Sequence, residues 1–110
     1  DFTFVDDAIR ATLAAALSPY VTGDVFNVGT GVETSINELA EKIMKVTNYN
    51  GEIRYMTKRS VDIVNRRSVN ISRIKEKLQW HPETSLIAGL TKTYQWLQGG
   101  NANESLPRDD

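Results

Sequence analysis

The chain has 110 residues, a formal net charge of −1 and no cysteine. This length predicts one small domain, and the near-neutral charge argues against nucleic acid as the main partner. The lack of cysteine excludes disulfides and thiolate metal sites and fits a reducing compartment, so we expect a cytoplasmic protein. No apolar run has the length of a membrane span, and no charged segment precedes an apolar run. We therefore expect neither a membrane partner nor a signal peptide.

The first part of the sequence alternates predicted strands and helices. Residues 1–5 are rich in aromatic and β-branched side chains and predict a short strand. Asp6 or Asp7 is then expected to cap an alanine-rich helix that ends before Pro19, because the residue preceding a proline leaves the helical region. A helix with so many alanines packs closely against a neighbour. Residues 23–29 predict a second strand.

A second helix is predicted to follow a capping box. Ser35 and Glu38 have the S-x-x-E spacing in which each side chain bonds to a backbone amide of the first turn. The apolar residues that follow recur at helical spacing and form one stripe: Ile36, Leu39, Ala40, Ile43 and Met44. Residues 48–51 then predict a turn, and residues 52–56 predict a third strand.

Helices dominate the second half of the prediction. Asn70 or Ser72 is expected to cap a short helix that runs to about Leu78, and Ser85 is expected to start a last helix. The expected class is α/β, with α+β as the alternative: a small mixed domain of about three short strands and four helices. We expect residues 1–98 to form the domain and residues 99–110 to be a flexible tail.

Residues 27–41 have the layout of a dinucleotide-binding turn. Gly29 and Gly31 form a G-x-G after an apolar run, and a helix follows. A cofactor fingerprint needs a third glycine or an alanine, and Thr34 stands there instead. The interpretation we favour is a tight strand-to-helix turn in which both glycines adopt positive φ angles.

Catalytic constellations are weak in this sequence. His81 is the only histidine, and we expect it to be a surface cap at a helix end rather than an acid–base group. Asp6 and Asp7 sit where a helix dipole favours carboxylates, so capping is favoured over paired-carboxylate chemistry. No Tyr-x-x-x-Lys occurs. Residues 54–77 carry eight bases and two acids, and two readings stay open: a solvated face, or an anion site for a phosphorylated ligand.

Six short motifs follow one another along the chain. They are DFTFVDDAIRA (1–11), NVGTG (27–31), SINEL (35–39), RSVD (59–62), NISRIKEKLQWHP (70–82) and GLTKTYQW (89–96). In this order they resemble the C-terminal part of extended short-chain dehydrogenase/reductases, in particular the UDP-glucose 4-epimerase-like nucleotide-sugar epimerases and dehydratases. That family has tyrosine at Phe4, aspartate at Asn70, glycine at Gln79, and R-P-G-D for the fourth motif.

The resemblance implies a substrate-side piece without its catalytic part. The family's N-terminal glycine-rich NAD loop, its Tyr-x-x-x-Lys pair and the arginine before Asp1 are all absent from the sequence. The resemblance therefore implies no cofactor in this chain, although the full-length family uses NAD, and no catalytic competence alone. It places Arg59 on the diphosphate of a nucleotide sugar and Asp62 beside the nucleotide. For Arg66 and Arg67, phosphate contact and solvated charge remain equal alternatives.

The expected partners follow from the same resemblance. A nucleotide diphosphate sugar would bind weakly, since half of the pocket is missing. Apolar faces made for the missing part favour a homo-oligomer, with exchange of an element between copies as one route. The alternative interpretation is a stand-alone, non-catalytic binding or oligomerisation module derived from the family.

Overall fold

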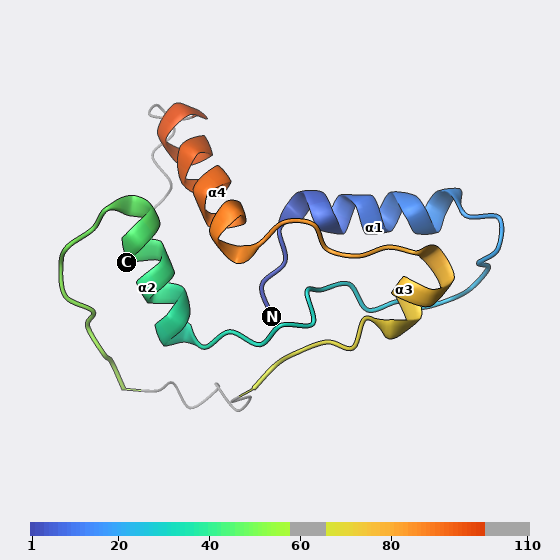
Figure 1. The fold of residues 1–110 in the computed structure, drawn as a ribbon, viewed down its shortest axis with the longest axis horizontal. Coiled ribbons are helices and arrows are strands. Elements are labelled where there is room, and N and C mark those ends of the chain that lie inside the picture. The colour runs from blue at the N-terminus through green and yellow to red at the C-terminus, as the bar shows by residue number, and fades with distance from the viewer. Residues whose placement is uncertain (58–65, 101–110) are drawn as a thin grey trace.

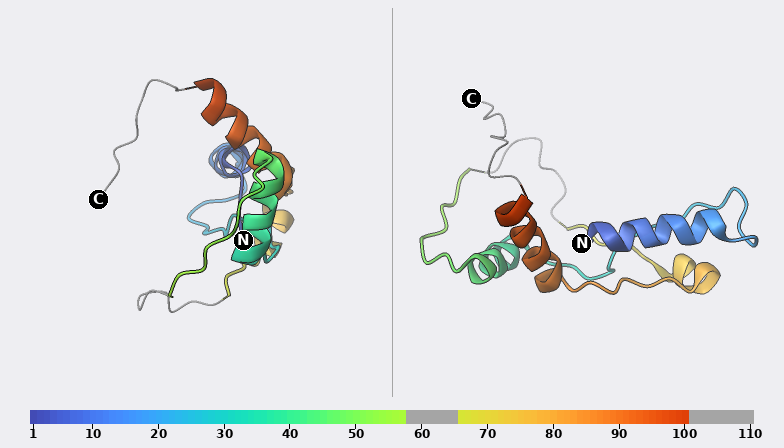
Figure 2. Two further views of the ribbon diagram at one scale, coloured as in Figure 1. Left: turned by 90° about the vertical axis from the view of Figure 1, so that its left-hand side faces the viewer. Right: turned by 90° about the horizontal axis from the view of Figure 1, so that it is seen from above.

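The structure, a computed structural model, describes residues 1–57 and 66–100. These residues form four helices: α1 (Val5–Leu17), α2 (Ile36–Thr47), α3 (Ser72–Leu78) and α4 (Leu86–Gly100). Helices α1 and α3 lie on one side of the molecule, and α2 and α4 lie side by side on the other, joined by long extended segments (Figure 1). The views in Figure 2 keep the same separation.

No strand forms within residues 1–57 and 66–100, so the predicted α/β class with three strands is wrong. A strand is defined by hydrogen bonds to a neighbouring strand, and none of the predicted stretches has a partner of that kind in the described chain. The side-chain alternation that prompted the prediction is nevertheless real, since Val25 is exposed and Phe26 is half-buried. The sequence pattern reports an extended backbone with two different faces, and that backbone lacks a sheet to join.

The boundaries of α1 match the prediction at one end only. The helix ends at Leu17, directly before Ser18-Pro19. Its N-cap is Phe4, which makes no side-chain cap bond, so the expectation that Asp6 or Asp7 is the cap is wrong. Both aspartates lie inside the first turn, where the helix dipole still favours their charge.

The predicted capping box of α2 is confirmed. The Ser35 hydroxyl accepts from the Glu38 amide at 3.2 Å, and the Glu38 carboxylate accepts from the Ser35 amide at 2.7 Å. The helix ends at Asn48, which is left-handed with φ 54°. These local bonds define both ends of α2 without help from the rest of the chain.

The two later helices begin near the predicted residues. The Asn70 side chain accepts from the Ser72 amide at 2.9 Å, one residue ahead of the N-cap of α3, which is Ile71. Helix α3 ends at Gln79, a left-handed residue with φ 51°. In α4, the Ser85 hydroxyl accepts from the Ala88 amide at 3.3 Å.

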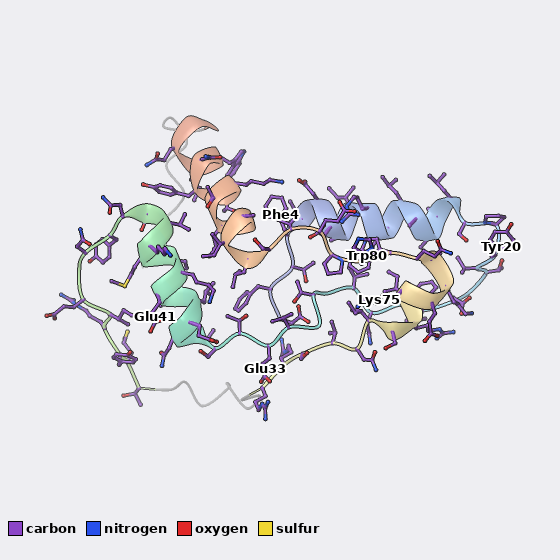
Figure 3. All side chains as sticks on the ribbon, in the orientation of Figure 1. Phe4, Tyr20, Glu33, Glu41, Lys75 and Trp80 are labelled. Carbon is purple, nitrogen blue, oxygen red and sulfur yellow. The ribbon has the colours of Figure 1, made fainter. Side chains whose placement is uncertain are left out.

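The core is small and lies between α1 and α3. Its buried apolar side chains are those of Ala11, Ile71, Ile74 and Trp80, with Phe26, Val69 and Leu78 packed around them. Figure 3 shows Trp80 between the two helices. The close packing expected of an alanine-rich α1 is therefore seen, because Ala11 is 1% exposed. Among the described residues, no helix combines the length and hydropathy needed to cross a bilayer.

Helix α2 contributes no buried residue and contacts α4. The N-terminal segment closes this pair from one side. A Cβ on Gly89 of α4 would lie 3.1 Å from the Phe4 ring, so glycine allows the ring to rest on the helix.

Candidate functional site

The 27–31 turn is held by the carboxylate of Asp1. One oxygen accepts from the Thr30 amide at 2.8 Å and from its hydroxyl at 2.7 Å. The other accepts from the Gly31 amide at 2.9 Å and from the Val69 amide at 3.3 Å. A single side chain thus joins the N-terminal segment, the turn and the segment that leads into α3.

This turn does not fit a cofactor cradle. The amides that would face a pyrophosphate, those of Thr30 and Gly31, are already engaged by the Asp1 carboxylate. Gly31 has φ 72°, as expected for a tight turn. Gly29 does not have a positive φ. It is needed because any Cβ there would collide with the Val69 side chain. The expectation of positive φ is therefore right for one glycine and wrong for the other, and the turn is a packed junction.

Further side-chain contacts tie residues 66–70 to the same turn. Arg66 makes a two-pronged ion pair with Glu33, with nitrogen–oxygen distances of 2.7 and 2.6 Å. The Arg66 guanidinium lowers the pKa of the Glu33 carboxyl, and the carboxylate raises the pKa of Arg66. The Asn27 amide donates to the Asn70 carbonyl at 3.4 Å.

The basic region is thus only partly described. Arg59 and Asp62, the residues predicted to bind the diphosphate and the nucleotide, lie outside the described residues. Arg66, for which two roles were open, has its guanidinium on Glu33 in this structure. The carbonyl of Arg67 accepts from the backbone nitrogen of Asp1 at 3.0 Å. The described end of this region therefore joins the turn before the chain reaches α3.

A second polar cluster is built around Asp7, whose side chain is 1% exposed. The carboxylate accepts from Arg10 at 2.5 Å and from the amides of Glu83 and Thr84 at 3.2 and 3.0 Å. Burial raises the pKa of Asp7, but the Arg10 guanidinium and the two amides outweigh it and leave the pKa below its usual value. The charged form of Asp7 therefore holds residues 83–84 against α1.

Arg10 extends this cluster toward the region before α4. Its guanidinium also donates to the Glu83 carboxylate at 2.8 Å and to the His81 carbonyl at 3.2 Å. His81 takes part through its backbone, and its side chain is exposed. Asp7 was expected to be a cap, so its role in joining distant segments was missed. The i,i+3 spacing of Asp7 and Arg10 was the available signal.

Two cavities meet at Phe2. The larger, about 430 Å³, lies between the turn and residues 82–86 and is lined by several hydroxyl groups. The smaller, about 220 Å³, is bounded by residues 2–4, α2 and the start of α4, and its walls are mainly apolar. Both cavities open at the junction between the two halves of the molecule.

Comparison with known proteins gives a consistent result. No family model matches the chain. It is 35% identical over 103 residues to the UDP-N-acetyl-alpha-D-glucosaminuronate decarboxylase of Bacillus cytotoxicus, covering 88% of this chain and 32% of that protein. The UDP-glucose 4-epimerase of Thermotoga maritima, solved with UDP-glucose, superposes with a TM-score of 0.82 at 36% identity, covering 89% of this chain and 31% of that one.

The chain is homologous to the C-terminal portion of the extended short-chain dehydrogenase/reductases. A further member with the same fold is the Bordetella bronchiseptica enzyme WbmF, solved in complex with NAD⁺ and UDP. It has a TM-score of 0.75 at 34% identity and is covered over 29% of its length. The family assigned from the six motifs is thus confirmed. This chain spans about a third of the length of the reductase-family proteins that it matches.

Proposed function

We propose that this chain is the nucleotide-sugar-binding C-terminal portion of an NAD-dependent sugar epimerase or dehydratase, without catalytic competence of its own. The observation that carries this proposal is the superposition on the UDP-glucose-bound epimerase over 89% of the chain at 36% identity. The UDP complex of WbmF supports the same ligand class. The turn does not act as a cofactor cradle, so NAD would be bound by other parts of a complete enzyme.

Arg59 and Asp62 are the residues proposed to hold the ligand. A guanidinium binds phosphate oxygens through two parallel hydrogen bonds, which suits a diphosphate. Arg66 supports this assignment indirectly, because its guanidinium is engaged by Glu33 in the described structure. Arg59 is therefore the preferred phosphate ligand of the basic region, with Asp62 beside the nucleotide.

Calorimetric titration with UDP-, GDP- and dTDP-sugars tests the proposal. Arg59→Ala should weaken binding by about ten- to a hundredfold, since a charge-assisted pair contributes roughly 1.5–3 kcal/mol. Arg59→Lys should restore only part of the affinity, because an ammonium cannot form the two-pronged contact. The loss should be larger for UDP than for uridine, which has no phosphates.

Arg66→Ala is the matched control, and we expect it to leave UDP affinity unchanged. Loss of affinity in Arg66→Ala together with full affinity in Arg59→Ala would show that the site assignment is wrong. Absence of binding to any of the three nucleotide sugars would reject a ligand-binding role for the isolated chain.

The alternative is a stand-alone binding or oligomerisation module, and the exposure of large apolar side chains favours it. Leu17, Tyr20 and Met56 are 80%, 88% and 92% exposed. We expect the isolated chain to self-associate, plausibly by exchange of an element between copies, because such surfaces promote association. Light scattering at high micromolar concentration measures this. A strict monomer that binds no apolar dye would contradict it.

A further inference from the structure

Helix α1 exposes larger apolar side chains than it buries. Toward the core it presents Ala11 and Asp7, each 1% exposed. On the other side stand four aliphatic side chains, here called the outer stripe: Val5, Ile9, Leu13 and Leu17, which are 59%, 52%, 53% and 80% exposed. Side chains rise from α1 away from α3, and no other described segment covers them (Figure 3).

The outer stripe is continuous along the helix. Its members are four residues apart, which places them one above the next along the helix surface. Single exposed apolar residues are normal on soluble proteins, but a contiguous apolar patch marks an interaction site. The usual amphipathic helix turns its large apolar side chains inward, and α1 does the opposite.

The charged residues of α1 are already paired within the chain. Asp7 and Glu83 hold Arg10, at 2.5 and 2.8 Å. Asp6 lies 3.8 Å from Lys92 of α4. These pairs direct the charges of the helix toward its own chain, so the outer stripe offers an uncharged surface that fits an apolar partner.

The comparisons indicate the occupant. The chain superposes on the Thermotoga maritima epimerase with a TM-score of 0.82, yet covers 31% of it. In that structure the counterpart of α1 belongs to a polypeptide about three times as long. We propose that the outer stripe is the docking face for the other two-thirds of a family-length polypeptide, which covers it with an apolar surface. The proposal rests on the proposed function, since both treat the chain as part of a larger enzyme.

A fusion protein provides the test. The 110-residue chain is joined through Asp1 to the part of the Thermotoga maritima epimerase that precedes the matched region. Leu13→Asp is introduced into the fusion and into the unfused chain, and Tm is measured by calorimetry without ligand. In the fusion, Tm should fall by roughly 10 °C or more, because a buried unpaired charge costs several kcal/mol. In the unfused chain, Tm should change by no more than about 2 °C, as expected for an exposed site.

Two control variants sharpen the result. Leu13→Met keeps an apolar side chain and should leave the fusion's Tm unchanged. Met56→Asp makes the same kind of change at a 92% exposed side chain outside α1 and should be tolerated in both proteins. Because the readout needs no ligand, its failure is distinguishable from failure of the UDP titration.

Several results would overturn the proposal. They are a fusion that tolerates Leu13→Asp, an unfused chain that loses as much stability as the fusion, and a fusion that does not fold before any substitution. A further one is an unfused dimer that Leu13→Asp dissociates while the fusion tolerates it. In that case, the occupant of the outer stripe is a second copy of this chain.

Discussion

The two halves of the molecule are stabilised in different ways. In the described chain, every buried apolar side chain belongs to the half that contains α1 and α3. Helices α2 and α4 contact each other, but α2 buries nothing and has a complete capping box. The first half therefore depends on contacts between distant segments, while the second depends on local helix signals.

Carboxylates supply many of the distant contacts in the first half. Asp1 joins the 27–31 turn to residue 69, and Asp7 joins α1 to residues 83–84. Asp24 binds two bases of α3, Arg73 at 2.5 Å and Lys77 at 3.0 Å. Polar contacts thus connect segments that a core of four buried apolar side chains leaves loosely joined.

The largest effect is expected from Asp7→Ala, which removes the most buried of these carboxylates. Loss of its ion pair and of the acceptors for two amides should cost roughly 3–4 kcal/mol. The estimate stays toward the lower end because Arg10 is partly exposed. Thermal unfolding followed by circular dichroism should show loss of the folded state. Retention of a cooperative transition near the unmodified Tm would mean that the cluster does not hold this half together.

The same carboxylate gives a pH dependence. Its folded pKa is below the usual 3.8, so its contribution to stability is complete above that pH and is lost as the pH falls through the folded value. Asp7→Asn should flatten stability against pH below about 4 while leaving the profile between pH 5 and 7 unchanged. Denaturant titrations at a series of pH values measure the change.

A smaller effect should separate the two halves directly. Ile74→Ala removes a side chain that is 1% exposed and should cost about 2–4 kcal/mol. Ile43→Ala makes the same change in α2, where the side chain is 41% exposed, and should cost about 1 kcal/mol or less. Urea unfolding of both variants gives the comparison. Equal losses would show that the α2–α4 half has a core of its own.

The smallest effect should be local to α2. Ser35→Ala removes the hydroxyl acceptor of the capping box and should cost about 1 kcal/mol. Hydrogen exchange should speed up at the first turn of α2 and stay unchanged in α3, because the cap acts only on its own helix. Faster exchange in both helices would indicate that the two halves unfold as one unit.

The sequence allowed the helices to be predicted but not the relation between segments. Pro19 and the Ser35–Glu38 box act within a few residues, so their signals were sufficient. The strands were predicted wrongly because alternation indicates an extended backbone, and pairing requires a partner strand that no local pattern reveals. The clamping roles of Asp1 and Asp7 were missed for the same reason, since their partners lie far along the chain.

The candidate ligand site stands differently. Its family came from motif order and was confirmed by comparison. Arg59 and Asp62 remain predictions, because they lie outside the described residues. What the structure adds is the packed turn and the Glu33–Arg66 pair, which depend on three-dimensional proximity between residues 33 positions apart.

Gln79 shows what a motif of this kind transmits. The motifs recognised in the sequence have a glycine there, and Gln79 adopts the left-handed conformation that glycine adopts freely, with φ 51°. A side chain in that region costs roughly 1–2 kcal/mol. The chain has thus retained a torsion angle after losing the letter that encoded it. Counted by letters, such a position is a mismatch. Counted by backbone geometry, it is a match, which is one way in which 36% identity accompanies a TM-score of 0.82.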